Sequence, residues 1–155
     1  MDWINKENLT LFIAVWGAGL STYKAVSDYR KNVRRVKVEL SYGFISQANI
    51  LGPMLIILSA ANVGNREVIL NSMGYLLPDG KRSVTIEPQS DVRFPYALSE
   101  GKKCLVWKEQ RRFAEELSKH GYSGKIKIRG YYQSATGEMF KSKPFDFDIE
   151  SALIA

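Results

Sequence analysis

The spacing of hydrophobic and polar positions changes near residue 35. Between residues 23 and 33 apolar side chains recur every three or four positions, which is the period of an α-helix. From residue 36 to 42 apolar and polar side chains alternate, which is the period of a half-buried strand. The sequence therefore predicts a helix over about residues 8–35 and a β-rich domain after it.

The β-rich part is divided by turn signals into short segments. Strands are expected at residues 36–42, 54–63, 67–77, 82–88, 103–107 and 124–134, and within 138–150. The second and third of these should form a hairpin around Gly64-Asn65. One helix interrupts the strands: it places Phe113 and Leu117 on one face and ends at Gly121. The fold class that follows is mainly β, an antiparallel sandwich with one short helix.

Residues 8–23 form an uncharged run that admits three interpretations. As a helix it covers about 24 Å, less than the roughly 30 Å of a hydrocarbon core, so a soluble core helix stays open. A cleaved signal peptide needs a basic start, whereas residues 1–23 carry a net charge of −1. The leading interpretation is an uncleaved transmembrane helix, since Trp16 and Tyr23 suit the membrane interface and Lys24 can reach the headgroups.

Positive charge is concentrated directly after this run. Residues 24–37 carry a net charge of +5, whereas residues 38–155 carry only +2, so a global nucleic-acid surface is not supported. Basic flanks stay cytoplasmic. The expected topology is a single pass through the inner membrane, with the N-terminus outside and the C-terminal domain in the cytoplasm. The residues expected at the membrane surface are Lys24, Arg30, Lys31, Arg34 and Arg35.

The chain thus divides into three parts: a tail and transmembrane helix (1–23), a basic helical neck (24–35) and a β-sandwich domain (36–155). Within the span, small residues lie four apart, a spacing that lets helices approach closely in lipid. The candidates for helix association are Ala14, Gly17, Ala18 and Ser21. Glycine and alanine are also common in such helices, so composition alone explains the pattern equally well.

Two segments, LSAANVGNREVILNSMGYLLPDGK and PYALSEGKKCLVW, resemble bacterial immunoglobulin-like sandwiches. The resemblance covers roughly residues 36–150 and rests on turns and core positions, so it implies a fold and no catalytic or ligand residues. The paired cysteines of antibody-type domains are missing, because Cys104 is the one cysteine. The whole layout is similar to uncharacterised single-span bacterial membrane proteins that carry such a domain.

The sequence has few residues of the kinds that catalyse reactions or bind metals. His120 is the one histidine and falls in the last turn of the expected helix, where it suits the helix dipole. Cys104 falls in a strand, away from any base. Asp146, Asp148 and Glu150 alternate, which would put three carboxylates on one strand face, most simply a solvated one. No metal site, cofactor or catalytic residue is therefore expected, and the protein is predicted not to be an enzyme.

The remaining candidate for ligand binding is a basic stripe on the last hairpin. Its residues are Lys125, Lys127, Arg129, Lys141 and Lys143. Such a stripe could contact headgroups, a nucleotide or RNA, although nothing else in the sequence supports a nucleic-acid partner. It would equally serve as the solvated side of an edge hairpin, where lysine opposes aggregation.

Together these features predict a membrane-anchored cytoplasmic binding or interaction module: a tether, sensor or assembly subunit. Its expected partners are the lipid bilayer and another protein or further copies of itself. The alternative is a membrane effector, whose soluble domain senses a ligand and whose short helices oligomerise to perturb the bilayer.

Overall fold

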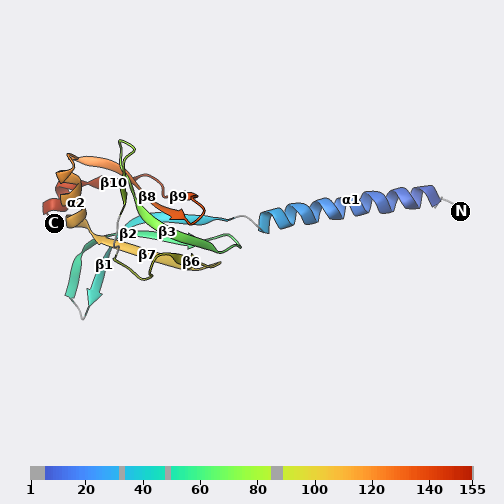
Figure 1. The fold of residues 1–155 in the computed structure, drawn as a ribbon, viewed down its shortest axis with the longest axis horizontal. Helices are drawn as coiled ribbons and strands as arrows, with labels where there is room; N and C mark the ends of the chain where they lie inside the picture. The colour runs from blue at the N-terminus through green and yellow to red at the C-terminus, as the bar shows by residue number, and fades with distance from the viewer. Residues whose placement is uncertain (1–5, 32–33, 48–49, 85–88, 155) are drawn as a thin grey trace. The chain divides into compact units, whose positions relative to one another are not determined.

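The computed structural model describes residues 6–31, 34–47, 50–84 and 89–154 (Figure 1). The chain forms two units, Met1–Val33 and Arg34–Ala155. The helices are α1 (Lys6–Lys31), α2 (Gln110–Lys119) and α3 (Ile149–Ile154). The strands are β1 (Val36–Gln47), β2 (Ile50–Asn62), β3 (Val68–Leu76), β4 (Arg82–Val84), β5 (Gln89–Ser90), β6 (Tyr96–Leu98), β7 (Lys103–Glu109), β8 (Lys125–Ser134), β9 (Met139–Lys141) and β10 (Phe145–Asp148).

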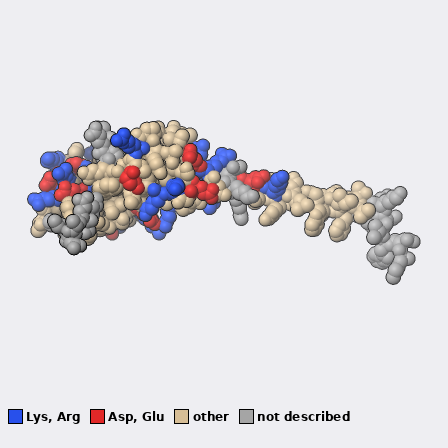
Figure 2. All heavy atoms as spheres, turned by 90° about the horizontal axis from the view of Figure 1, so that it is seen from below, with Lys and Arg blue, Asp and Glu red and all other residues tan. Residues whose placement is uncertain are grey.

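Helix α1 exposes its large apolar side chains. Its segment Leu9–Tyr29 is long and apolar enough to cross a membrane, and the protein itself buries none of it. Large side chains such as Phe12 and Trp16 are 75% and 67% exposed. Figure 2 shows the same surface as an almost uninterrupted stretch without charge. The helix ends at Lys31, so it is shorter than the span to residue 35 expected from the sequence.

The strands of the second unit form two antiparallel sheets, as the alternating pattern predicted. One sheet has the order β1-β2-β7-β5. The other has the order β10-β8-β3-β4, with β6 also pairing with β3 and β9 with β8. The sheets share one hydrophobic core, to which β2 contributes Ile56 and Leu58 and β3 contributes Leu70 and Met73.

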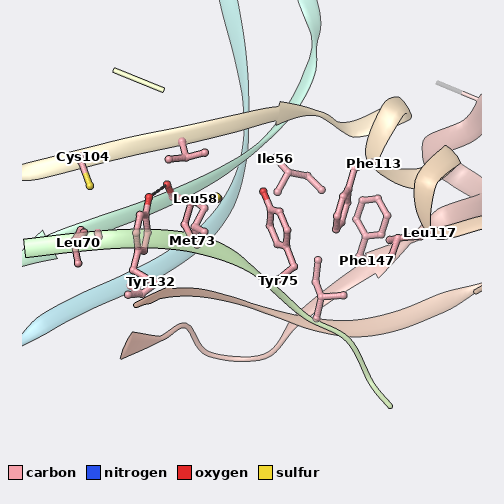
Figure 3. Close-up of a cluster of buried hydrophobic side chains, with 14 of the residues drawn as sticks. Ile56, Leu58, Leu70, Met73, Tyr75, Cys104, Phe113, Leu117, Tyr132 and Phe147 are labelled. Carbon is pink, nitrogen blue, oxygen red and sulfur yellow. Dashed lines mark hydrogen bonds between the residues drawn. The ribbon is translucent and has the colours of Figure 1, made fainter. Parts of the chain in front are cut away.

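Strands β2 and β8 come into close contact inside this core. The hydroxyl of Tyr132 on β8 donates a hydrogen bond of 2.8 Å to the carbonyl of Leu58 on β2, across the two sheets (Figure 3). Gly130, also on β8, faces the same leucine: an added Cβ would lie 2.1 Å from Leu58 Cδ1 and 3.0 Å from Leu40 Cδ1. A side chain at position 130 would therefore displace Leu58, and glycine avoids this where the sheets approach closely.

The turn after β2 does not make the predicted hairpin. Strand β2 pairs with β1 and β7, whereas β3 pairs within the other sheet, so the prediction was wrong. The reason is the buried Asn62 side chain. Its Nδ2 donates to the carbonyls of Arg66 (2.7 Å) and Leu98 (2.9 Å), and its Oδ1 accepts from the N–H of Gly64 (3.0 Å). These bonds fix a crossover from one sheet to the other.

The C-terminal part confirms some predictions and corrects others. Helix α2 buries Phe113 and Leu117 as expected, and Gly121 follows it with φ of +87°. Helix α3 was not predicted. Because it begins at Ile149, Glu150 lies on a helix and does not share a strand face with Asp146 and Asp148.

We expect Asn62→Ala to lower the free energy of unfolding by about 2–4 kcal/mol, since it leaves buried backbone groups without partners. The matched control is Asn65→Ala in the same turn, where the side chain is exposed; its effect should stay within about 0.5 kcal/mol. Chemical unfolding of the full chain in micelles, followed by near-UV circular dichroism, measures both. Equal losses in the two variants would show that Asn62 does not hold the crossover.

Candidate functional site

Two residues of the predicted basic stripe lie opposite carboxylates. On the outer face of the second sheet, Lys127 lies opposite Asp146, and Lys125 lies opposite Asp148. Paired residues of antiparallel strands point to the same face, so each of these lysines has a carboxylate beside it. The Asp148 pKa is lowered, chiefly because the Ser151 backbone N–H donates to it and to a smaller extent because of Lys125.

The remaining cations form a different group from the one expected. Arg129 on β8 and Arg82 on β4 both lie opposite Leu76, on either side of β3. Lys141 on β9 lies opposite Tyr131, on the same outer face. We call Arg82, Arg129 and Lys141 the sheet cations. Arg82 was not part of the predicted stripe, because only the strand order β8-β3-β4 places it across β3 from Arg129. The last member of the stripe, Lys143, lies exposed beyond the end of β9.

Tyr131 lies between the sheet cations and is only 2% exposed although it faces outward. Its ring covers Gly74: an added Cβ there would lie 2.9 Å from the tyrosine hydroxyl oxygen and 2.2 Å from the carbonyl oxygen of Ser83. Burial raises the Tyr131 pKa, and the charge of Arg82 lowers it to a lesser extent. On this face the three sheet cations are exposed, whereas the Tyr131 side chain is buried.

The predicted neck residues fall into different environments. Lys24 is exposed on α1, whereas Arg34 donates to the hydroxyl of Thr136 at 3.3 Å. The carbonyl of Arg35 accepts from two backbone N–H groups of the β2–β3 crossover. The side chains of Arg30 and Lys31 lie outside the described part. The small residues Ala14, Gly17, Ala18 and Ser21 are all exposed on α1.

The two residues with catalytic potential are separated. Cys104 is buried in β7, and burial raises its pKa to about 11, so its thiol stays protonated at neutral pH. His120 lies after α2, and its Nδ1 is 2.7 Å from the carbonyl oxygen of Glu116. Since a carbonyl can only accept, Nδ1 carries the proton. Among the described residues, no group of three or more potential metal ligands occurs.

A cavity of about 160 Å³ lies between the β3–β4 hairpin and the end of α2. Its apolar walls come from Leu77, Phe113 and Leu117, and its polar lining includes Ser83 and His120. Figure 3 shows Phe113 and Leu117 at the end of the core that α2 covers, with the Tyr75 ring tilted against that of Phe113. The sequence predicted the helix face but not the cavity, because nothing in the pattern places Leu77 against that face.

Three side chains fasten the two sides of the cavity to each other. The hydroxyl of Tyr122 donates to Asp79 at 2.6 Å, and the Lys81 ammonium lies 3.0 Å from the same carboxylate. The tyrosine hydrogen bond, followed by that of Lys81, lowers the Asp79 pKa to about 2. We call Asp79, Lys81 and Tyr122 the rim clamp. It joins the β3–β4 turn to the loop that follows α2.

Neither a family model nor a curated protein matches the chain. Solved structures similar to it include the following two. A Bordetella pertussis protein described as ApaA has 11% identity and a TM-score of 0.39, covering 74% of this chain and 94% of its own. The structural genomics target SoR45 has 16% identity and a TM-score of 0.36, covering 76% and 88%. Neither likeness identifies a family.

The rim clamp can be tested through the titration of Asp79. Tyr122→Phe should raise the Asp79 pKa from about 2 toward its ordinary value of 3.8, and Lys81→Met should also raise it, because it removes both a hydrogen bond and a positive charge. Because the folded pKa is depressed, the clamp is complete above the ordinary carboxyl pKa and is lost as the pH falls through about 2. Carbon-13 NMR of the aspartate carboxyl measures each value. An unchanged Asp79 pKa in Tyr122→Phe would show that the tyrosine does not hold the carboxylate.

Proposed function

We propose that this protein is a single-pass inner-membrane protein whose cytoplasmic immunoglobulin-like domain is a non-enzymatic binding module. The observation that carries the proposal is the surface of α1. From Leu9 to Tyr29 the protein covers none of this apolar segment. Removing such a surface from water is worth roughly 25 cal/mol per Å², so α1 is stable only where lipid or another apolar surface surrounds it.

The length of the helix agrees with a membrane span. The 21 residues of Leu9–Tyr29 cover about 32 Å as a helix, close to the roughly 30 Å of a hydrocarbon core. A helix also satisfies its own backbone hydrogen bonds, which lipid cannot do. Lys24 lies inside this segment near its C-terminal end, where its ammonium can reach the headgroups. Arg30, Lys31, Arg34 and Arg35 follow the segment, and this asymmetry supports a cytoplasmic location for the domain.

The second unit supports the binding module. Two antiparallel sheets around one core are the arrangement expected of an immunoglobulin-like sandwich without its disulfide. The sheet cations provide an exposed surface for an acidic partner, since Arg82, Arg129 and Lys141 have no carboxylate opposite them in the described strand pairings. The proposed partners of these surfaces, the sheet cations and the apolar face of α1, are another protein or further copies of this chain.

Membrane insertion can be tested by placing charge inside α1. Val15→Lys with Leu20→Lys should move the protein from the carbonate-resistant membrane fraction to the soluble fraction, because each lysine costs roughly 2.5–3.5 kcal/mol at the centre of a span. Tyr29→Lys, at the end of the segment, should leave the protein in the membrane.

Orientation is tested with the same chain. A reporter that works only in the cytoplasm should be active when it is fused to the C-terminus. A reporter that works only in the periplasm should be inactive at the same position. A periplasmic signal, or extraction of the unmodified chain by carbonate, would contradict the proposed topology.

We also propose that α1 associates with a second copy through Ala14, Gly17, Ala18 and Ser21, which repeat at intervals of three and four residues and therefore share one helix face. Gly17→Leu should weaken self-association several-fold in a membrane two-helix reporter assay. Gly19→Leu is the matched control, since Gly19 lies on another face and has equally open space around it. Equal responses of the two variants would contradict an interface on this face.

A further inference from the structure

We propose that the outer edge of strand β1 binds the β1 strand of a second copy of this chain, antiparallel to it, with the two Val38 residues opposite each other. The inference goes beyond the proposed function, because it uses neither α1 nor the sheet cations. It holds whether or not α1 crosses a membrane.

Among the described strands, β1 is the one long strand that lies at the edge of its sheet. It has 12 residues and pairs with β2 alone. The other edge strands are β4, β5, β6, β9 and β10, and each has two to four residues. Short edge strands protect a protein against pairing with other chains. Strand β1 lacks this protection.

The hydrogen bonds of β2 show which backbone groups of β1 point outward. The N–H of Asn62 donates to the carbonyl of Lys102, directly before β7, at 3.0 Å. The N–H of the next residue, Val63, donates in the opposite direction, to the carbonyl of Arg35 at 2.9 Å. Because bonded and non-bonded pairs alternate along an antiparallel ladder, Val36, which lies opposite Asn62, directs its N–H and carbonyl away from β2.

The same alternation leaves the backbone groups of Val38 and Leu40 open on this edge. Strands β8 and β9 approach β1 from the other sheet, but they pair with each other and not with β1. Within the described ranges, no backbone hydrogen bond from another strand reaches these three residues. A row of open N–H and carbonyl groups is a template for one more strand.

The charges beside this edge favour a second copy as that strand. The side chains of Lys37 and Glu39 are 66% and 55% exposed, and their charged atoms lie 2.6 Å apart. In an antiparallel pair with Val38 opposite Val38, each Lys37 lies opposite the Glu39 of the second copy. Opposite charges in this position stabilise a strand pair, whereas like charges destabilise it. Strand β1 is therefore complementary to itself.

One register satisfies the charges and the backbone together. It places Val36 opposite Leu40 and Val38 opposite Val38, so residues with outward backbone groups face each other and can exchange both hydrogen bonds. The two neighbouring registers also join outward groups. They would, however, place two Glu39 or two Lys37 side chains opposite each other, which is unfavourable.

A charge-exchange experiment tests this pairing in the full chain in detergent micelles. Energy transfer between copies labelled at the C-terminus measures association. Lys37→Glu and Glu39→Lys should each associate with themselves at least about 5-fold more weakly than the unmodified chain. A mixture of the two variants should recover association, because each Glu then lies opposite a Lys.

The design separates pairing between copies from effects within one chain. Both variants lose the exposed ion pair between residues 37 and 39, so its loss cannot explain recovery in the mixture. Helix α1 is unchanged in all samples and contributes equally. The matched control is Lys103→Glu. Lys103 lies on the same outer face of the sheet, two strands from the edge, and its substitution should leave association unchanged.

Amide hydrogen exchange tests the backbone of the same edge. The N–H groups of Val38 and Leu40 should exchange at least about 10-fold more slowly in concentrated than in dilute protein, since the second strand covers them. Those of Lys37 and Glu39 point toward β2. They should be protected at both concentrations, which makes them an internal control.

Two results would overturn the inference. One is a mixture of the charge variants that associates no better than either variant alone. The other is exchange at Val38 and Leu40 that does not depend on concentration, which would exclude a second copy and leave a strand of another protein as the occupant. Both readouts report on the second unit, so they remain readable if α1 fails to enter the membrane. Failure of this interface and failure of the proposed function are therefore distinguishable.

Discussion

The contact between β2 and β8 is the constraint on which the rest of the domain depends. The hydrogen bond from Tyr132 to the Leu58 carbonyl joins the two sheets through their core, and Gly130 allows the backbone of β8 to approach the Leu58 side chain. Because β8 is central in its sheet, this contact also fixes β3 and β10 beside it. The positions of the sheet cations and of the cavity both follow from that arrangement.

The part of the fold that could be predicted is the part decided by local pattern. Alternation, apolar runs and turn signals identified the longer strands, and the spacing of Phe113 and Leu117 identified the buried face of α2. The crossover after β2 could not be predicted, because Gly64-Asn65 has the composition of a hairpin turn. What decides its path is Asn62, whose side chain bonds to the carbonyl of Leu98, 36 residues away. The residues near the turn do not indicate that Leu98 is the partner of Asn62.

The candidate sites follow the same division. The basic stripe was visible as alternation along one strand, but its charge depends on which residues lie opposite it. Asp146 offsets Lys127, whereas Arg82 adds to Arg129 from across β3. The cavity depends on long-range placement throughout, since Leu77 and Tyr122 approach each other only through the fold. Sequence patterns describe faces of single elements, and binding sites arise where several elements meet.

The contact between Gly74 and Tyr131 has a consequence for how this chain can change over time. The ring occupies the space that a side chain at position 74 would need, and the Ser83 carbonyl closes the same space from β4. A larger residue at 74 would displace the tyrosine, and a smaller residue at 131 would uncover the backbone. Because the Ser83 carbonyl belongs to the backbone and lies nearest, no substitution at position 131 makes room for a side chain at position 74. Position 74 should therefore stay glycine among descendants of this sequence.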